Sequence, residues 1–499
     1  MIMFASNTQM SRLKSAHPIS RARVSAWLIA TLIASLTLVG CTTPKLKSSV
    51  QVPSQFAAAR ATMSEPEVAW WESFGDPVLS DLIQRAAHEN RDIKIATQRV
   101  RAARAGEVIS RSWLMPNISG VAGGFDAQTG YDAARRQAFP DAKIVGGGVD
   151  VYWEVDLAGR LRSGAAAASA DTIAAEHGVR GVRLLVVSDV ASNYFTLVGA
   201  LRQLETVRAI SATQDETLRL VKARQRVGLA TPFDVERAET DASRAHAAIP
   251  PLETLVAVSR HRIAVLIGDQ AFNAASIVPW KGELVAPDAR SGQPAALLQR
   301  RPDLLALKAQ LDAANWRRQQ AAAEWFPRLF LNALFGSQHV DVNDMGLGTA
   351  RFSNVFGLMT MPIFNAGRTR AINDIAESNQ KTAVLRYEDG IVRALEDVEN
   401  SLVILSDERR RSESLKSAAA SADAALGRAQ SLYDRGQIDL LPLLDAQRSR
   451  LVVRVSANDS NTQLLLDTVQ LYKALGGGWQ VFEPPATPAA DAVKARPHS

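Results

Sequence analysis

Residues 149–157 read Val149-Asp150-Val151-Tyr152-Trp153-Glu154-Val155-Asp156-Leu157. Apolar and polar residues alternate along this segment, and the side chains of a β-strand point to opposite faces with a period of two. The apolar face holds Val149, Val151, Trp153, Val155 and Leu157, and the polar face holds Asp150, Tyr152, Glu154 and Asp156. A membrane barrel strand shows this pattern, with one face toward lipid and the other toward the lumen. A half-buried strand of a soluble sheet has the same period, so the surrounding sequence must distinguish the two.

Very long helical segments follow this strand and its counterpart later in the chain. No proline occurs in the 91 residues between Pro140 and Pro232 or in the 79 residues between Pro362 and Pro442. We expect long helices over residues 160–227 and 368–435, and return helices over residues 232–267 and 440–475. Apolar residues of the first long helix recur every seven positions, which is typical of a coiled coil. They are Val187, Tyr194 and Leu201, and Val190, Leu197 and Leu204.

The sequence after the first seventy residues repeats itself once. Equivalent residues recur 211 or 208 positions apart, namely Asp92 and Asp303, Pro116 and Pro327, Gly228 and Gly436, and Gly268 and Gly476. A period this long indicates a duplicated domain and not a solenoid. We predict structural repeats at residues 70–285 and 286–480, with a linker at 41–69 before them and a flexible tail at 481–499 after them.

Each half is expected to contribute two strands, so that the fold is mostly α with a small β membrane part. The predicted strands are residues 117–125 and 149–157 in the first half and 329–336 and 352–363 in the second. In lipid, an open sheet leaves unpaired backbone groups at two edges, each costing several kcal/mol. Four strands cannot close around a lumen. Other copies of the chain must therefore complete the sheet, which predicts a homo-oligomer.

The first forty residues indicate export to the cell envelope. Arg21 and Arg23 precede an uncharged, mostly apolar run that is too short to span a bilayer comfortably, as in a signal peptide. The run ends in Leu38-Val39-Gly40-Cys41, which resembles a bacterial lipobox, and Cys41 is the only cysteine. We predict a signal peptide at residues 1–40 and a covalent lipid on Cys41; the alternative is a signal anchor with an incidental cysteine. No segment after Cys41 is expected to form a transmembrane helix.

Charge and reactive residues argue against several classes of function. The net charge of +6 comes largely from the first forty residues, since the remainder holds 53 basic against 51 acidic residues. No basic surface for nucleic acid is expected. The seven histidines are dispersed, and no phosphate-binding loop or nucleophile elbow occurs. We therefore expect neither an enzyme nor a metal site, and no cofactor besides the lipid on Cys41.

Three groups of residues form a signature that spans the chain. They are Trp70-Trp71 with Phe74-Gly75-Asp76-Pro77, Asn90 and Asp92; Arg300-Arg301-Pro302-Asp303 with Ala313-Ala314 and Phe326-Pro327; and Leu443-Leu444-Asp445-Ala446-Gln447-Arg448. This combination resembles the TolC-like outer-membrane efflux factors, in particular the NodT/OprM-type lipoprotein subgroup. The resemblance covers nearly all of residues 41–480.

The resemblance implies an architecture and a set of partners. The architecture is a homotrimer whose twelve strands form one β-barrel in outer-membrane lipid, continued by an α-helical tunnel in the periplasm. The implied partners are a periplasmic adaptor (membrane fusion) protein and an inner-membrane RND-type transporter. The chain would then be the passive exit duct of a tripartite efflux pump for drugs or toxic small molecules.

The ends of the two long helices predict tight turns. Gly228 and Gly436 suit the left-handed residue that ends a helix. Thr231-Pro232-Phe233-Asp234 is typical of an N-cap followed by a first-turn proline and an acidic third residue, and Asp439 can cap the second return helix. In the family that the chain resembles, tyrosine, arginine and aspartate near such turns close the tunnel and contact the adaptor.

By residue-for-residue match, the candidates for this gate are Asp234, Tyr433, Asp445 and Arg448. Three of the four have a simpler interpretation. Asp234 can be only a capping carboxylate, and Asp445 and Arg448 can be an ordinary pair on a helix surface, worth a few tenths of a kcal/mol.

Two other functions share most of these features. A type I protein-secretion duct would have the same architecture. A structural coiled-coil envelope lipoprotein without a channel would share the lipobox and the sevenfold repeat, but it would leave the alternation of residues 149–157 unexplained.

Overall fold

The computed structural model describes residues 43–58, 67–132, 134–282, 284–288 and 290–483. The predicted signal peptide, Cys41 and nearly all of the predicted tail lie outside these residues. The chain divides into two compact units. The strand unit contains Arg111–Gly164 and Arg317–Asp374, and the helical unit contains Lys45–Ser110, Ala165–Trp316 and the chain from Ile375 onward.

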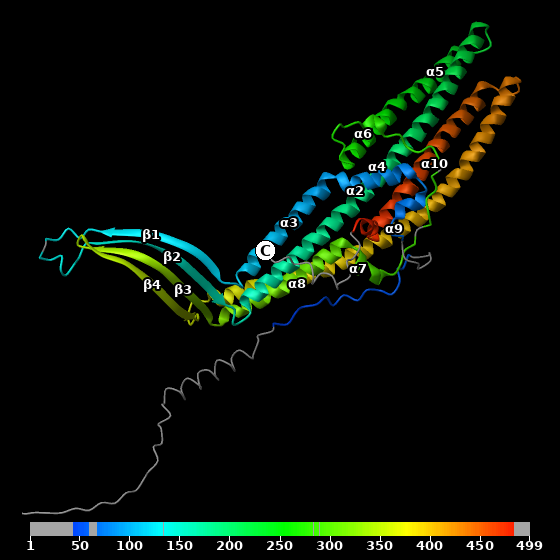
Figure 1. The fold of residues 1–499 in the computed structure, drawn as a ribbon. Coiled ribbons are helices and arrows are strands. Elements are labelled where there is room, and N and C mark those ends of the chain that lie inside the picture. The colour runs from blue at the N-terminus through cyan, green and yellow to red at the C-terminus, as the bar shows by residue number, and fades with distance from the viewer. Residues whose placement is uncertain (1–42, 59–66, 133, 283, 289, 484–499) are drawn as a thin grey trace, which may run out of the picture. The chain divides into compact units, whose positions relative to one another are not determined.

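The same order of elements occurs twice along the chain (Figure 1). The first half contains α2 (Pro77–Glu89), α3 (Arg91–Ser112), β1 (Asn117–Ala127), β2 (Ala142–Val155), α4 (Arg160–Arg226), α5 (Pro232–Ala247) and α6 (Ile249–Leu266). The second contains α7 (Leu297–Arg300), α8 (Pro302–Ala322), β3 (Arg328–Val342), β4 (Met345–Thr360), α9 (Arg368–Asp434) and α10 (Leu440–Ala474). Short 3-10 helices are η1 (Trp70–Phe74), η2 (Ala274–Ser276), η3 (Pro294–Ala296), η4 (Ala323–Trp325) and η5 (Trp479–Phe482).

The long helices α4 and α9 contain 67 residues each, so each measures roughly 100 Å at about 1.5 Å per residue. Both end one residue before the predicted ranges. The first return helix differs from the prediction, because it is broken at Ala248 into α5 and α6. Pro250 and Pro251 stand in the first turn of α6, and a proline is tolerated in the first turn of a helix but not in its interior.

The prediction for the end of β2 was wrong. The strand ends at Val155, so Asp156 and Leu157 belong to neither face of the sheet. The carboxylate of Asp156 accepts hydrogen bonds from the backbone N–H groups of Leu161 (3.2 Å) and Arg162 (2.9 Å) at the start of α4. Gly159 turns the chain there with φ of +77°. Asp156 is thus a capping residue, and alternation alone did not distinguish it from a strand residue.

The strands form one antiparallel sheet in the order β1-β2-β3-β4, which leaves β1 and β4 at its edges. Asn117 lies opposite Tyr152, Tyr152 opposite Asn332, and Asn332 opposite Phe356. The only register shift in the sheet lies beside Val340 and Asp341, next to the β3–β4 turn. Each strand is longer than nine residues, as a tilted strand across a membrane must be.

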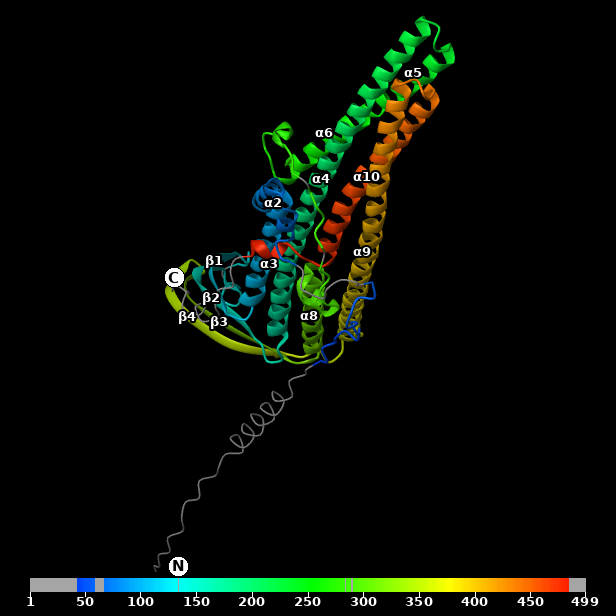
Figure 2. The ribbon, with the colours of Figure 1, turned by 90° about the vertical axis from the view of Figure 1, so that its right-hand side faces the viewer.

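In the helical unit, α4 with α5 and α9 with α10 form two hairpins whose turns lie at the same end (Figures 1 and 2). Hydrogen bonds join the hairpins along their length. Gln447 of α10 donates to the hydroxyl of Thr217 of α4 at 3.0 Å, and the amide of Asn458 donates to Gln203 at 3.1 Å. Contrary to our expectation, a stretch of α4 is long and apolar enough for a membrane span, with mean hydropathy of 1.5. Since 67% of that stretch is buried inside the protein, packing accounts for its composition.

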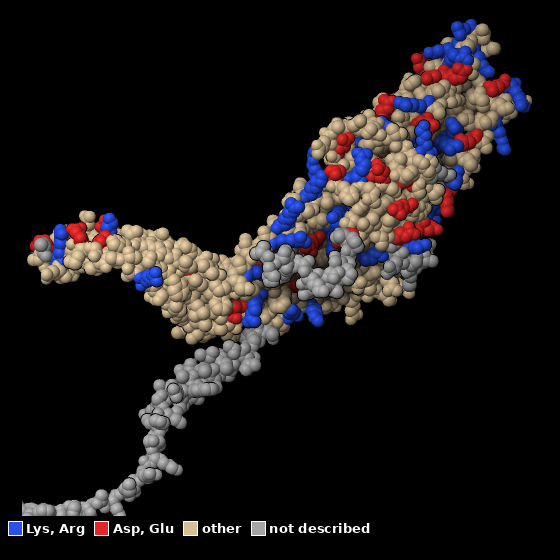
Figure 3. All heavy atoms as spheres, viewed as in Figure 1, with Lys and Arg blue, Asp and Glu red and all other residues tan. Residues whose placement is uncertain are grey.

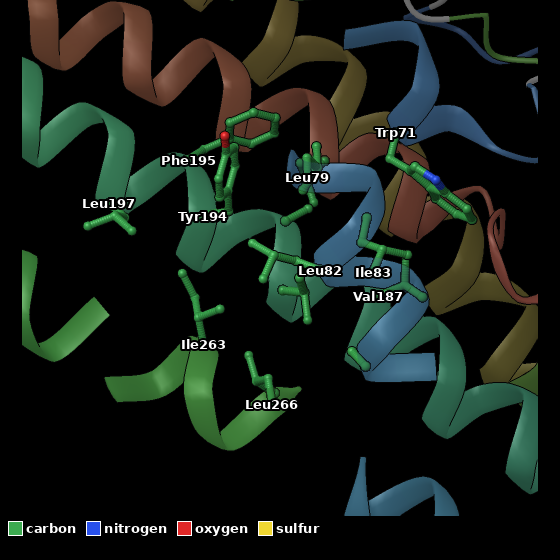
Figure 4. Packing of buried hydrophobic residues seen from close by; sticks show 14 of the residues in the cluster. Trp71, Leu79, Leu82, Ile83, Val187, Tyr194, Phe195, Leu197, Ile263 and Leu266 are labelled. Carbon is green, nitrogen blue, oxygen red and sulfur yellow. The ribbon is translucent and has the colours of Figure 1, made fainter. Parts of the chain in front are cut away.

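Four of the six sevenfold apolar residues of α4 belong to the main core of the helical unit; Leu201 is half-buried against it, and Leu204 is buried outside it. Val187, Tyr194 and Leu197 of α4 face Leu79 and Leu82 of α2 and residues of α6 such as Ile263 and Leu266 (Figure 4). The predicted seam is therefore buried, but against several helices and not against one coiled-coil partner.

A buried polar network fixes α2 against α4. Asp76 caps α2 by accepting hydrogen bonds from the N–H groups of Val78 and Leu79, and its other carboxylate oxygen accepts the hydroxyl of Tyr194 at 2.5 Å. The hydroxyl of Tyr194 in turn accepts the N–H of Trp280 at 3.1 Å. Burial is the main cause that raises the pKa of Tyr194, and the hydrogen bond to Asp76 raises it further. The phenol therefore stays neutral and remains a donor.

The segment before the first repeat lies along α8 and α9. Leu46 exchanges hydrogen bonds with the side chain of Asn315, and Ser49 donates twice to the carboxylate of Glu388. The N–H groups of Ala57 and Ala58 both donate to Glu399. The predicted linker thus contains an extended segment that is fastened to the second half of the chain.

Candidate functional site

The two helix turns have the same backbone design. Gly228 and Gly436 have φ of +77° and +70°, as predicted for residues that end a helix. At the first turn, the N–H of Leu229 donates to the carbonyl of Arg224 at 2.8 Å, and at the second the N–H of Gln437 donates to that of Leu432 at 2.9 Å. This pairing across six residues is the Schellman motif, which satisfies the last carbonyls of a helix.

The first turn is fastened by its own side chains. Thr231 and Asp234 form a capping box, in which each side chain accepts the backbone N–H of the other residue. The hydrogen bond from the Thr231 N–H is the main cause that lowers the pKa of Asp234, and the hydrogen bond from the Thr231 hydroxyl lowers it further. The structure thus gives Asp234 the local capping role that the sequence allowed.

The second turn lacks this fastening. Asp439 stands at the N-cap of α10, but its side chain makes no capping hydrogen bond. Tyr433 is instead only 3% exposed and carries the guanidinium of Arg224, from the first hairpin, over its ring at 4.1 Å. Burial raises the pKa of Tyr433, with Arg224 opposing the shift. Tyr433 therefore joins the two hairpins near their turns.

Asp445 and Arg448 form the predicted pair on the surface of α10. Their side chains meet at 2.6 Å and are 66% and 54% exposed. Among the residues that the structure describes, no hydrogen bond or ion pair connects them with Tyr433 or Asp234. A single chain thus brings Tyr433 near Asp234, whose charge contributes to the pKa of the tyrosine, and leaves Asp445 and Arg448 facing outward.

Apolar residues at the first turn are a feature that our sequence reasoning missed. Leu229 and Phe233 are 77% and 67% exposed, and Val227 is similarly exposed. They flank Gly228, where a solvent-exposed turn would ordinarily carry polar residues. Exposed apolar residues that cluster in this way mark an interaction surface.

The two faces of the sheet differ in chemistry. The Val149 face carries mostly apolar side chains near the strand ends that join the helices: Ile118, Val149, Val151, Trp153, Val155, Leu329, Leu331, Ala333, Phe335, Val355 and Met359. At the same level, the Asp150 face carries all the charged side chains together with several apolar ones: Asn117, Ser119, Asp150, Tyr152, Glu154, Arg328, Phe330, Asn332, Leu334, Asn354, Phe356, Leu358 and Thr360.

Both carboxylates of the Asp150 face are paired, one with a residue of the neighbouring strand and the other with the start of a helix. The amide of Asn332 donates to Asp150 at 2.9 Å, and Arg160 at the start of α4 binds Glu154 with two nitrogens.

On the Val149 face, the indole N–H of Trp153 donates to the carbonyl of Leu114 at 3.1 Å. The view of the strand unit in Figure 3 shows mostly uncharged surface between the tip of the strands and the helix starts. Such a surface suits lipid contact.

Both edge strands expose apolar side chains. Ile118 and Phe125 of β1 and Val355 and Phe356 of β4 are all more than half exposed. Exposed, long, apolar edges are templates for pairing with another chain. The sheet of one chain is thus incomplete in both chemistry and hydrogen bonding.

The chain contains an open four-stranded sheet and two helical hairpins, each with one helix of roughly 100 Å at about 1.5 Å per residue. These elements suit a channel subunit. The chain belongs to the outer membrane efflux protein family, whose model matches residues 82–269 and 294–477. This confirms the resemblance based on Trp70-Trp71, Arg300–Asp303 and Leu443–Arg448. The protein accordingly acts in efflux at the outer membrane.

Similar proteins extend over almost the whole chain. Outer membrane protein OprJ of Pseudomonas aeruginosa is 30% identical over 465 residues, which are 92% of this chain and 97% of OprJ. Pyoverdine export outer membrane protein OpmQ of the same organism is 31% identical over 88% of this chain and 94% of its own length. The solved outer-membrane channel OprN has a TM-score of 0.80 and 26% identity, and the match covers 88% of this chain and 100% of OprN.

Proposed function

We propose that three copies of this chain form the exit duct of a tripartite efflux pump. The observation that carries the proposal is the sheet with two unpaired apolar edges in a member of an outer-membrane efflux family. Pairing β4 of one copy with β1 of the next satisfies the edges, and three copies give twelve strands, enough to enclose a lumen. The Asp150 face lines this lumen, and the Val149 face contacts lipid.

The helical hairpins continue the duct in the periplasm, with their turns at its inner end. Tyr433, Asp445 and Arg448 hold this end closed, because their copies converge on one axis in a trimer. Asp445 and Arg448 pair with each other on the exposed surface of one chain, and in the trimer they exchange this contact for pairs across copies. The apolar residues at the first turn contact a periplasmic adaptor protein, which connects the duct to an RND-type transporter in the inner membrane.

The duct conducts passively and has no enzymatic activity. Its cargo is a class of drugs or toxic small molecules selected by the transporter; among the relatives, OpmQ is named for pyoverdine export. A lipid on Cys41 anchors the start of the mature chain in the membrane.

The test is the mass and conductance of the protein purified from outer membranes in detergent. We expect the mass of three chains and discrete single-channel currents after insertion into a planar bilayer. A monomer that forms no channels would contradict the duct. Substituting Cys41 by alanine separates the alternatives, because a lipoprotein without a channel would then become soluble without detergent, whereas a barrel would not.

A further inference from the structure

The Asp150 face changes its chemistry half-way along the strands. Beyond Asp150, toward the β1–β2 loop and the β3–β4 turn, three successive rows of this face contain no charged side chain. The rows are Val121, Gly148, Gly336 and Phe352; Gly123, Gly146, Gln338 and Ala350; and Phe125, Ile144, Val340 and Gly348. We call the apolar side chains of these rows the sleeve: Val121, Phe125, Ile144, Val340 and Phe352.

The opposite face changes in the reverse sense at the same level. Near the loops, the Val149 face carries Asp126, Lys143, Ser337, His339, Asp341 and Arg351. A register shift of one residue would move the side chains of a strand to the other face of the sheet. No such shift occurs up to Val340, so each strand keeps the same residues on the same face. The sleeve is therefore not a continuation of the lipid-contacting surface.

Crowding identifies the Asp150 face as the inner side of the curved sheet. Along β3, the residues of this face are all half-buried, whereas Leu331, Phe335, Ser337 and His339 of the other face are exposed. A Cβ built on Gly336 would collide with the carbonyl of Gly147 and lie 2.7 Å from Cζ of Phe352, so the ring of Phe352 covers this glycine. A Cβ on Gly148 would meet the carbonyl of Phe335. Glycines in a strand mark such bends and close approaches.

We infer that the sleeve is a transient binding site in the outer half of the duct, which binds the apolar part of uncharged amphiphilic organic molecules in transit. This inference rests on the proposed trimeric duct, in which the Asp150 face lines the lumen. In the next three rows the only polar side chain is the amide of Gln338, so an alkyl or aromatic group gains apolar contact there. The sleeve is thus a transient site for amphiphiles.

The test compares hexyl β-glucoside with glucose as blockers of single-channel current. We expect the glucoside, below its micelle concentration, to interrupt the current of the wild-type duct, and glucose to have no such effect. The double variant Ile144→Thr/Val340→Thr keeps branching at Cβ, removes one methyl group at residue 144 and places two hydroxyls in the sleeve. It should weaken the block by about fivefold or more.

Two controls make the result specific. Val145→Thr/Val149→Thr also places two hydroxyls, but on the opposite face, and should leave the glucoside block unchanged. Asp150→Asn should reduce the preference for cations and leave the glucoside block unchanged. All variants are first compared with the wild type for oligomeric mass.

The outcomes distinguish the sleeve from the duct itself. A wild-type protein that forms no channels overturns the proposed function. Channels whose cation preference responds to Asp150→Asn, but whose glucoside block is equal in the wild type and the Ile144→Thr/Val340→Thr variant, overturn the sleeve and leave the duct in place. Equal loss of block in the Val145→Thr/Val149→Thr control also overturns it.

Discussion

The two helix turns share their backbone but differ in what holds them. Both use a left-handed glycine and a Schellman pairing. The first turn is closed by the capping box of Thr231 and Asp234, whereas Asp439 at the second makes no such bond and Tyr433 contacts Arg224 of the other hairpin. A turn held by its own residues suits a fixed docking surface. A turn held by contacts with a neighbour can open when that neighbour moves.

The largest effect should come from the second turn. Tyr433→Ala with Asp445→Ala removes the contact with Arg224 and the partner of Arg448, so the inner end of the duct should leak. We expect the baseline conductance in a planar bilayer to rise on the order of tenfold. Glu216→Ala is the matched control, because it breaks an exposed i,i+3 pair with Arg219 on α4. An unchanged baseline in the double variant would remove these residues from the gate.

The next effect concerns the exposed apolar residues of the first turn. Leu229→Ser with Phe233→Ser should weaken binding to the purified periplasmic adaptor about tenfold, because apolar contacts at the centre of an interface dominate its affinity. The melting temperature should not change, since both side chains are mostly exposed. Val452→Ser, an exposed position on α10 away from the turns, should leave adaptor affinity intact. Equal affinity for all three proteins would place the adaptor elsewhere.

A smaller effect should separate the two N-caps. Thr231→Ala removes a capping box and should destabilise its turn by about 1 kcal/mol. Asp439→Ala removes a side chain that makes no capping bond and should cost less than about 0.3 kcal/mol. Hydrogen exchange of the amides around each turn measures both. Equal protection losses at the two turns would contradict the difference drawn here.

The smallest effect is a dependence of the first turn on pH. The folded-state pKa of Asp234 lies below its ordinary value of 3.8, chiefly because of the Thr231 N–H. The ionised carboxylate therefore stabilises the turn above that ordinary value, and the contribution is lost as pH falls through the lowered pKa. Proteolysis of the turn by pepsin, divided at each pH by the rate for an unfolded peptide substrate to remove pepsin's own pH dependence, should be steady from pH 5 to about pH 4 and should accelerate below it. Asp234→Ala should abolish that acceleration; if the variant still shows it, another group is responsible.

Sequence reasoning succeeded where structure depends on local chemistry. Gly228 and Thr231-Pro232 define a helix end and a helix start through their own backbone preferences, so the first turn was predictable. The start of β2 was not, because Gly146-Gly147-Gly148 has no strand pattern of its own. Those glycines lie in the strand because neighbouring backbone approaches closely, with Gly336 across the sheet.

In the candidate site, too, local contacts could be predicted from the sequence and contacts between distant residues could not. The sequence indicated Asp234 as a cap and the Asp445–Arg448 pair, since both are contacts within one helix. The contact between Arg224 and Tyr433 joins residues far apart in the chain, and the exposure of Leu229 and Phe233 depends on what surrounds the turn. Neither could be derived from spacing, and Asp156 was misplaced because a capping carboxylate and a strand residue look alike in an alternating sequence.

Because the sheet has two unpaired edges, a faulty copy of the chain can also disable the intact copies with which it assembles. A copy with one spoiled edge, for example through a proline in β4, can still join a neighbour through its intact edge, and the ring then cannot close. In a cell that makes intact and faulty copies together, the yield of working ducts should follow the cube of the intact fraction. A strain that carries one intact and one faulty gene would therefore lose far more than half of its export capacity, and such alleles should behave as dominant.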